Sequence, residues 1–226
     1  MRLLLASASP ARLGVLRAAG LDPLVEVSAV DEDALLADLA HVTPHRRVTA
    51  LAEAKAGWVA ARIGSDTNSR AGNGGSGGND VGEPPTVVVG CDSMLLVDGE
   101  LVGKPGTVDV ARRRWAAMAG RTGELITGHA VLVVRDGTVQ SSAAAHRSTL
   151  VHFAEPTGTE LTAYLESGEP LAVAGGFTLD GLGGWFVDRI EGDPSNVIGI
   201  SLPLTRRLLT EVGVALTDLW PATRVG

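Results

Sequence analysis

Residues 86–93 read TVVVGCDS, and this stretch decides the fold expected for the rest of the chain. Its β-branched apolar run is the strongest buried-strand pattern in the sequence and stops at Asp92. We therefore expect a strand at 86–91 that leaves Asp92 and Ser93 at the carboxyl edge of a sheet, where ligands of open α/β sheets bind. Asp92 either coordinates a hard cation or takes a proton from water there, or it only caps the following turn. Strand alternation points Cys91 away from Asp92, into the core.

Strand and helix patterns follow one another on both sides of this run. The apolar spacing and the turn residues predict an α/β or α+β class with a central sheet, and we find no internal repeat. Turns are expected at Asp98–Gly99 and Asp136–Gly137. Strands are predicted at 2–6, 24–30, 125–134 and 139–153, with short glycine-separated strands within 177–190, and helices at 10–19, 44–63, 107–119, 157–166 and 203–212.

Composition narrows the class of protein. The chain has 226 residues, with 45% apolar and 20% charged, as in ordinary globular domains. Its net charge of −7 argues against nucleic-acid or membrane-surface partners, which need summed positive potential. A single cysteine forms no intramolecular disulfide, and the short apolar start resembles no signal peptide, so we expect a cytoplasmic protein. Residues 64–86 hold seven glycines among polar residues, which predicts a flexible insertion inside one domain over residues 1–226.

Lysine is rare in this chain. Only Lys55 and Lys104 stand among the 19 basic residues, and the rest are arginine. Base composition of the genome explains the arginines, but a remaining lysine is a candidate for a chemical requirement because ammonium and guanidinium are not interchangeable. Lys104 lies in GKPG, after a hairpin that returns toward Asp92, and Lys55 lies on an otherwise apolar helix, AEAKA. The alternative is two ordinary solvated lysines.

The run SASPAR at residues 7–12 has the pattern of an anion site. A strand passes into a helix here, with Ser9 as the N-cap and Pro10 in the first turn. The free backbone N–H groups and the helix dipole attract an anion, Ser7 and Ser9 add hydroxyl donors, and Arg12 adds a forked cation. A capped helix with a solvated arginine is the competing interpretation.

A second carboxylate for a metal ion is expected from the acidic triplet at residues 31–33. Glu32 is the candidate that would join Asp92, with simple surface acidity as the alternative. The five histidines show no metal-ligand spacing and are assigned nothing. Motifs of P-loop, nucleophile-elbow and dinucleotide-binding proteins are absent, which argues against those chemistries.

The motifs occur in an order that resembles the Maf family of nucleoside triphosphate pyrophosphatases, its actinobacterial members in particular. The resemblance implies a single Maf-like domain with the two-lobed α/β fold of the inosine triphosphatase group, an elongated mixed sheet and a nucleotide cleft between the lobes. It implies hydrolysis of nucleoside triphosphates to monophosphate and pyrophosphate with Mg²⁺ or Mn²⁺, a role in cleaning the nucleotide pool, and a homodimer. The matching runs are SASPAR from Ser7, the Asp31–Glu32 pair, AEAKA from Ala52, GCDS from Gly90, GKP from Gly103, LITG from Leu125, SGEP from Ser167, AGGF from Ala174 and GDPSNVIGI from Gly192.

The resemblance also implies roles for individual residues. Asp92 matches the proposed proton acceptor, Lys55 and Lys104 match phosphate-binding lysines, Arg12 matches the second arginine of the first motif, and Glu32 matches an acidic residue near the metal. An alternative function is a nucleotide-binding regulator of septum formation and cell division that needs no turnover. A third is a metal-dependent phosphatase that releases orthophosphate.

Three departures from the family pattern bear on substrate choice. Ala11 replaces the first motif arginine, LAV at 171–173 replaces an Asp and Lys, and Asp180 stands where one subfamily has Gln. The segment FTLDGLG at 177–183 is nearer to the subfamily that acts on methylated guanosine and cytidine triphosphates than to the one that prefers dTTP and UTP. Base specificity is therefore open.

Overall fold

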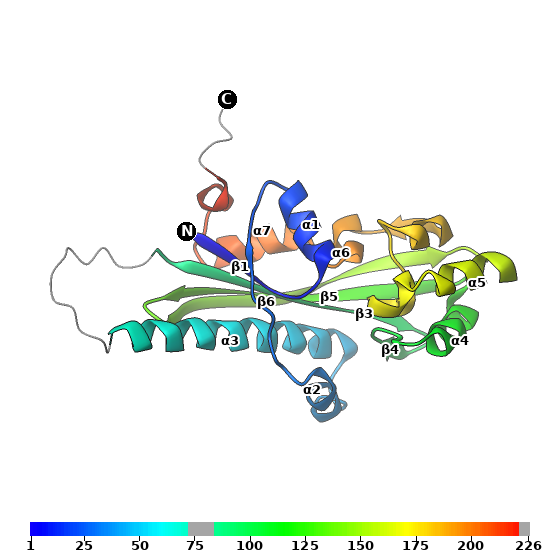
Figure 1. Ribbon diagram of the computed structural model, residues 1–226, viewed down its shortest axis with the longest axis horizontal. Helices are drawn as coiled ribbons and strands as arrows, with labels where there is room; N and C mark the ends of the chain where they lie inside the picture. The colour runs from blue at the N-terminus through cyan, green and yellow to red at the C-terminus, as the bar shows by residue number, and fades with distance from the viewer. Residues whose placement is uncertain (72–83, 222–226) are drawn as a thin grey trace.

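The expected α/β class is confirmed by a computed structural model, which describes residues 1–71 and 84–221. A seven-stranded mixed sheet runs along the molecule in the order β2-β1-β3-β5-β6-β7, and β4 pairs with β3 outside this path (Figure 1). β1 is parallel to β2 and β3, and the other pairs are antiparallel. The strands are β1 Arg2–Ala6, β2 Leu24–Val25, β3 Thr86–Val97, β4 Glu100–Val102, β5 Thr122–Arg135, β6 Thr138–Phe153 and β7 Val187–Glu191.

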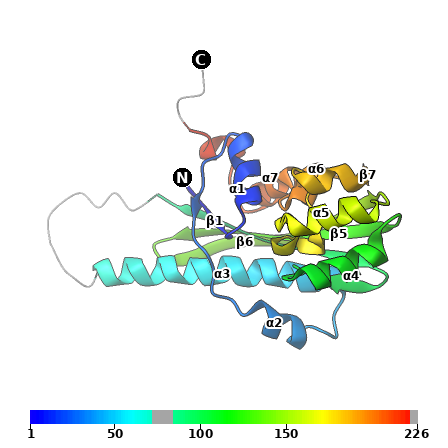
Figure 2. The same cartoon turned by 45° about the vertical axis from the view of Figure 1, so that its right-hand side comes forward.

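Helices cover both faces of this sheet. The long helix α3 runs along one face, while α1, α6 and α7 lie on the other (Figures 1 and 2). None of the helices in the described ranges is long and apolar enough to cross a membrane. The helices are α1 Pro10–Ala18, α2 Glu32–Asp38, α3 Pro44–Ala71, α4 Val108–Met118, α5 Gly158–Glu166, α6 Pro194–Ile198 and α7 Leu202–Glu211, with 3-10 turns η1 Glu169–Ala172, η2 Ala174–Gly176, η3 Leu182–Phe186 and η4 Leu216–Leu219.

The two lobes of the expected fold are built around separate apolar clusters. One cluster joins α1 and α7 to the odd-numbered residues of β3, among them Cys91. The other surrounds Trp115 of α4, whose ring meets Phe153, Tyr164 and Phe186 edge-on. The indole of Trp115 is fully buried, and its Nε1 donates to the carbonyl oxygen of Gly176 at 2.9 Å.

Two glycines let α3 approach the sheet. A Cβ atom on Gly128 of β5 would lie 2.2 Å from the backbone oxygen of Val48, and one on Gly90 of β3 would lie 2.4 Å from that of Ala52. Both distances are far below van der Waals contact, so only glycine fits. The close approach places the first half of α3 over the centre of β3.

Several expected elements are confirmed. Ser9 caps α1, and the hairpin turns at Asp98–Gly99 and Asp136–Gly137 are present, with φ of 49° at each aspartate. The strand expected at 24–30 is wrong beyond Val25, because β1 turns into a helix after Ala6 and leaves no backbone for a longer β2 to pair with.

Four further expectations are corrected or left open. The strand from Thr86 does not end at Cys91 but continues to Val97, because β5 accompanies it and β4 joins it at its far end. Most of 177–190 forms bends and η3, and a strand exists only at β7, because only the residues from Val187 onward pair with β6. Helix α3 continues past the expected end at Ile63 to Ala71. Of the insertion expected at 64–86, residues 72–83 lie outside the described residues.

Candidate active site

The candidate site lies at a gap in the edge of β3. One edge of β3 pairs with β5 along 86–96. The opposite edge pairs with β1 as far as Gly90 and with β4 from Leu95 onward. Among the described strands, none covers residues 91–94 between them. Asp92 therefore lies in the middle of β3, and the expectation that its strand ends there is wrong. It lies two residues beyond Gly90, the last residue of β3 that pairs with β1.

Asp92 faces α3 and contacts Lys55. Asp92 lies two residues from Gly90, on the face of the sheet that α3 covers. Its Oδ1 accepts a hydrogen bond from Lys55 Nζ, and the same ammonium lies 2.8 Å from Oε1 of Glu32. Lys55 and Asp92 are 8% and 7% exposed, while the Glu32 side chain is 47% exposed. The structure thus brings together three residues that the sequence separates widely.

Helix α2, which the sequence patterns did not predict, supplies Glu32. The acidic triplet is not only surface charge, because the Asp31 side chain accepts the N–H of Ala34 and begins the helix. Glu32 stands in the first turn, next to the positive end of the helix dipole. This position aims its carboxylate at Lys55 from the side of the cleft that faces solvent.

Arg12 approaches from the other face of the sheet. Its Nη2 donates to Ser93 Oγ at 3.0 Å, its Nη1 to Ser7 Oγ at 2.9 Å, and its Nε to the carbonyl oxygen of Gly199 at 2.8 Å. Ser93 follows Asp92 and so points to the opposite face, and its hydroxyl also bonds Thr127. The guanidinium is held on three sides, unlike a solvated surface arginine, and retains two of its five N–H groups for a ligand.

The serines of the first motif organise the start of α1. Ser9 Oγ accepts the N–H of Arg12 at 3.4 Å, and the N–H of Ser9 donates to Ser7 Oγ at 3.2 Å. Ser7 is buried, and both serines line the same cavity as Arg12. The motif therefore forms a preorganised turn between β1 and α1.

Lys104 reaches the gap from the second flanking strand. It follows β4, whose last residue Val102 pairs with Leu95 beside the gap. Lys104 is exposed and has no hydrogen bond or ion pair within the described part of the chain. The carbonyl oxygen of Gly103 is held by Arg114 Nη1 at 2.6 Å and by the N–H of Gly175 at 3.1 Å. The backbone before Lys104 is thus fixed while its side chain is free to bind.

All seven predicted site residues line one cleft of about 400 Å³. Its far wall comes from the other lobe and contains Phe177, Thr178 and Asp180. The family pattern connected this segment with base choice, but none of the three was predicted as a site residue. The glycine-rich run around them was the available signal, because glycines next to apolar residues indicate close backbone approach. Ser93 was also missed as a partner of Arg12. The predicted residues are Ser7, Ser9, Arg12, Glu32, Lys55, Asp92 and Lys104.

Buried titratable groups near the cleft are structural. Burial raises the pKa of the Cys91 thiol to about 12, so it stays protonated and belongs to the core as expected. Burial also lowers the pKa of His129 to about 3. Neutral His129 accepts the N–H of Ser201 at its Nε2 and bonds the Thr127 carbonyl at Nδ1. This histidine ties β5 to the start of α7 and does not titrate near neutral pH.

The donor set at the gap fits a hard divalent cation. Within the ranges described, no group of three or more His, Cys, Asp and Glu side chains converges. Mg²⁺ however binds proteins through one or two carboxylates, with water and substrate phosphates completing its shell. Glu32 and Asp92 converge on one ammonium, which shows that a positive charge is accommodated between them. The charged lining is balanced, with Arg12, Lys55 and Lys104 against Glu32, Asp92 and Asp180.

Fold and cleft together define an α/β protein with a charged cleft at a gap in the sheet edge. Comparison with known sequences names the family: the Maf-like protein pattern matches residues 2–212, and the chain belongs to that family.

Named relatives cover nearly the whole chain. A Rhodococcus jostii protein is 59% identical over 220 residues, covering 97% of this chain and 96% of its own. A Nocardia farcinica protein is 61% identical over 219 residues, covering 96% of each. A Mycolicibacterium gilvum protein is 53% identical over 220 residues, covering 97% and 98%. Each of the three is called a nucleoside triphosphate pyrophosphatase.

Proposed function

We propose that this chain is a nucleoside triphosphate pyrophosphatase, a hydrolase that converts nucleoside triphosphates, non-standard or modified ones among them, to monophosphate and pyrophosphate. The observation that carries the proposal is the Lys55 ammonium held between Asp92 and Glu32, in a cleft that Arg12 and Lys104 also line. Carboxylates for water activation and cations for phosphate binding then share one cavity. The names of the full-length relatives support the same reaction.

Asp92 is the proposed proton acceptor. Its Oδ1 bonds Lys55, whereas its Oδ2 makes no hydrogen bond with the described residues and can accept a proton from water. The water then attacks the α-phosphorus, the α–β bridging oxygen leaves with the pyrophosphate, and the water proton passes to Asp92. General base catalysis of this kind contributes about 10²–10⁴ in rate.

The cationic groups are proposed to bind and orient the triphosphate. The free side-chain N–H groups of Arg12 and the backbone N–H of Ala11 lie on one side of the cleft, and Lys104 lies on the other. Lys55 stands between the two carboxylates and can hold a phosphate oxygen beside Asp92. Together they stabilise charge that develops on the departing pyrophosphate.

Glu32 and Asp92 are the residues that would hold Mg²⁺ or Mn²⁺. The cation, when bound, supplies positive charge for the triphosphate and polarises its oxygens. This supply matters because the cleft carries as many carboxylates as cations, so protein charge alone does not neutralise a polyphosphate. Carboxylate oxygens, here one half-exposed at Glu32 and one buried at Asp92, and a tetra-anionic substrate are the ligand types that these ions prefer.

Product analysis tests the proposal. Purified protein is incubated with ATP, CTP, GTP, UTP, dTTP and 7-methyl-GTP in Mn²⁺ or Mg²⁺, and pyrophosphate and orthophosphate are measured separately. Pyrophosphate with an equal amount of monophosphate supports the proposal. Orthophosphate instead identifies a phosphatase, and nucleotide binding without either product identifies a regulator, as in the septum-formation alternative. The same panel measures base preference.

Two further properties are proposed with the activity. A cytoplasmic location suits a chain whose one cysteine, Cys91, is free and buried. The second property is the homodimer implied by the family resemblance. Light scattering on the purified chain measures the molar mass in solution and so distinguishes a dimer from a monomer.

A further inference from the structure

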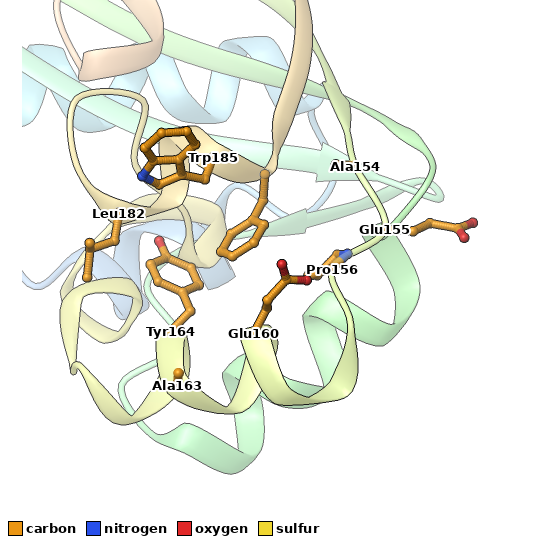
Figure 3. A pocket seen from close by; sticks show the side chains of 9 residues that line it. Ala154, Glu155, Pro156, Glu160, Ala163, Tyr164, Leu182 and Trp185 are labelled. Atoms are coloured by element: carbon orange, nitrogen blue, oxygen red, sulfur yellow. The ribbon is translucent and has the colours of Figure 1, made fainter.

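The loop from Thr178 to Gly183 separates the cleft from a second cavity. Thr178 and Asp180 line the cleft. Leu182, two residues later, lines a different cavity of about 550 Å³, together with Trp185 and Phe186. Figure 3 shows Leu182 and Trp185 on one wall of this cavity and Ala163 and Tyr164 of α5 on the wall facing them.

Side-chain packing therefore does little to hold this loop. Leu182 is 50% exposed and Trp185 is 85% exposed, so the apolar side chains next to the loop gain little from burial. The loop lies between two cavities, and it makes a close contact at Gly183, where a Cβ atom would lie 2.4 Å from the hydroxyl oxygen of Tyr164. Its shape must come from polar contacts.

Glu169 supplies those contacts from outside the cleft. Its Oε1 accepts hydrogen bonds from Thr178 Oγ1 and from the N–H of Gly183 at 3.0 Å, and its Oε2 accepts the N–H of Leu182 at 3.0 Å. One carboxylate thus joins both ends of the loop. Burial alone would raise the pKa of Glu169, but the hydrogen bonds from Thr178, Leu182 and Gly183 outweigh it and lower that pKa.

The fit around this carboxylate is tight. A Cβ atom on Gly181 would lie 2.7 Å from Glu169 Oε2, so the chain must pass close to the carboxylate at that point. Glu169 is itself held at the start of η1, where its N–H donates to Ser167 Oγ at 3.2 Å. The carboxylate is a fixed anchor around which the loop is folded.

We propose that Glu169 is a positioning residue for nucleotide binding, which holds the Thr178–Gly183 loop as the wall of the cleft that faces the nucleoside part of the substrate. The assignment of the nucleoside part rests on the proposed function: the cations of the cleft take the triphosphate, and the loop offers a threonine, an aspartate and apolar neighbours instead. Glu169 does not line the cleft, so it acts only through the loop.

The number of lost hydrogen bonds predicts a graded effect. Glu169→Gln keeps one acceptor oxygen for Thr178 and Gly183 but turns an NH₂ group toward the N–H of Leu182, so one of the three bonds is lost. Glu169→Ala loses all three. We expect the dissociation constant of the nucleotide and KM to rise about threefold in Glu169→Gln and about tenfold or more in Glu169→Ala, with kcat within about twofold of wild type.

The experiment measures binding and turnover separately. Calorimetry with α,β-methylene analogues of ATP, CTP, GTP and UTP gives dissociation constants without hydrolysis, and pyrophosphate release gives kcat and KM. Glu166→Gln is the matched control, because Glu166 ends α5, is exposed and makes no hydrogen bond or ion pair in the described part of the chain. Circular dichroism and thermal melting check that every variant is folded at the assay temperature.

The outcomes separate this inference from the proposed function. Weaker analogue binding in the order Glu169→Gln then Glu169→Ala, with the control unchanged, supports the inference even if the wild-type chain releases no pyrophosphate. Wild-type affinity in a folded Glu169→Ala variant overturns it. A fall in kcat and melting temperature with unchanged affinity also overturns it, because that result assigns Glu169 to general stability alone.

Discussion

Replacing Asp92 with asparagine removes the proposed proton acceptor while preserving the shape of the side chain. An amide oxygen still accepts a hydrogen bond from Lys55, but it does not take a proton from water. General base catalysis contributes about 10²–10⁴ in rate, so we expect kcat of Asp92→Asn to fall by that factor. Binding of an α,β-methylene nucleotide analogue should stay within about threefold, because Arg12 and Lys104 are untouched.

The same substitution lowers stability by a limited amount. Removing one partner of a buried ion pair costs about 3–5 kcal/mol when the other charge is left alone. Lys55 keeps Glu32 Oε1 at 2.8 Å, and the new amide retains a hydrogen bond, so we expect a loss of about 1–3 kcal/mol. For a chain of 226 residues this lowers the melting temperature by about 2–12 °C.

Pyrophosphate release and thermal melting measure both effects. Asp188→Asn is the control, because Asp188 is exposed on β7 and lines neither cavity. Assays run well below the melting temperature of the variant, so that a loss of rate is not a loss of folded protein. A folded Asp92→Asn variant with wild-type kcat refutes the assignment of the proton acceptor.

Four further predictions use other features of the structure. Lys104→Arg should lower kcat/KM about tenfold without changing the melting temperature, because Lys104 is exposed and unpaired within the described residues; unchanged kinetics would reduce this lysine to a solvated side chain. Lys55→Met should raise the affinity of the nucleotide-free protein for Mn²⁺ at least about tenfold, because it removes the ammonium between two carboxylates. Electron paramagnetic resonance of free Mn²⁺ measures this affinity, and an affinity equal to that of the wild type contradicts the prediction. Gly128→Ala should lower the free energy of unfolding by about 3 kcal/mol or more, since its Cβ would lie 2.2 Å from the backbone of α3. Gly14→Ala should raise the free energy of unfolding by about 0.5–1 kcal/mol, because nothing lies within 4 Å of the added Cβ and alanine favours the helix. Thermal melting compares the two variants. Burial lowers the pKa of His129 to about 3, whereas the same side chain in the unfolded chain keeps its ordinary pKa of 6.5 and binds a proton below that pH. The free energy of unfolding, measured in urea, should therefore fall by about 2 kcal/mol between pH 7 and pH 5. An unfolding free energy that stays constant over this range would contradict the prediction.

Some wrong sequence expectations share one cause. The strand expected at 24–30 has an alternating pattern, but β1 offers only Leu4 and Leu5 as partners. The strand from Thr86 was expected to end at Asp92 because a carboxylate interrupts the apolar run, yet β5 pairs with it throughout. The length of a strand depends on the backbone beside it, and that backbone comes from distant parts of the chain.

The candidate site was also predictable from the sequence only in part: its residues could be selected, but their contacts could not. Motif order and residue chemistry were sufficient to select seven residues, and all seven line one cleft. The sequence did not indicate that Lys55 contacts both expected metal ligands, that Arg12 bonds Ser93, or that Glu169 supports a wall of the cleft. Each of these contacts joins residues on different elements.

The sequence by itself determined the local features of this protein. Serine caps, aspartate–glycine turns and the alternation of Cys91 with Asp92 depend on neighbours within a few residues, so their physical cause is contained in short stretches of chain. Only the tertiary structure decided where the site lies: in the gap that β1 and β4 leave on the edge of β3. Lys55 and Asp92 are 37 residues apart in the chain, and they meet because the glycines of β3 and β5 let α3 pack against the sheet at close range. Contacts of that kind depend on the packing of whole elements, which no local pattern specifies.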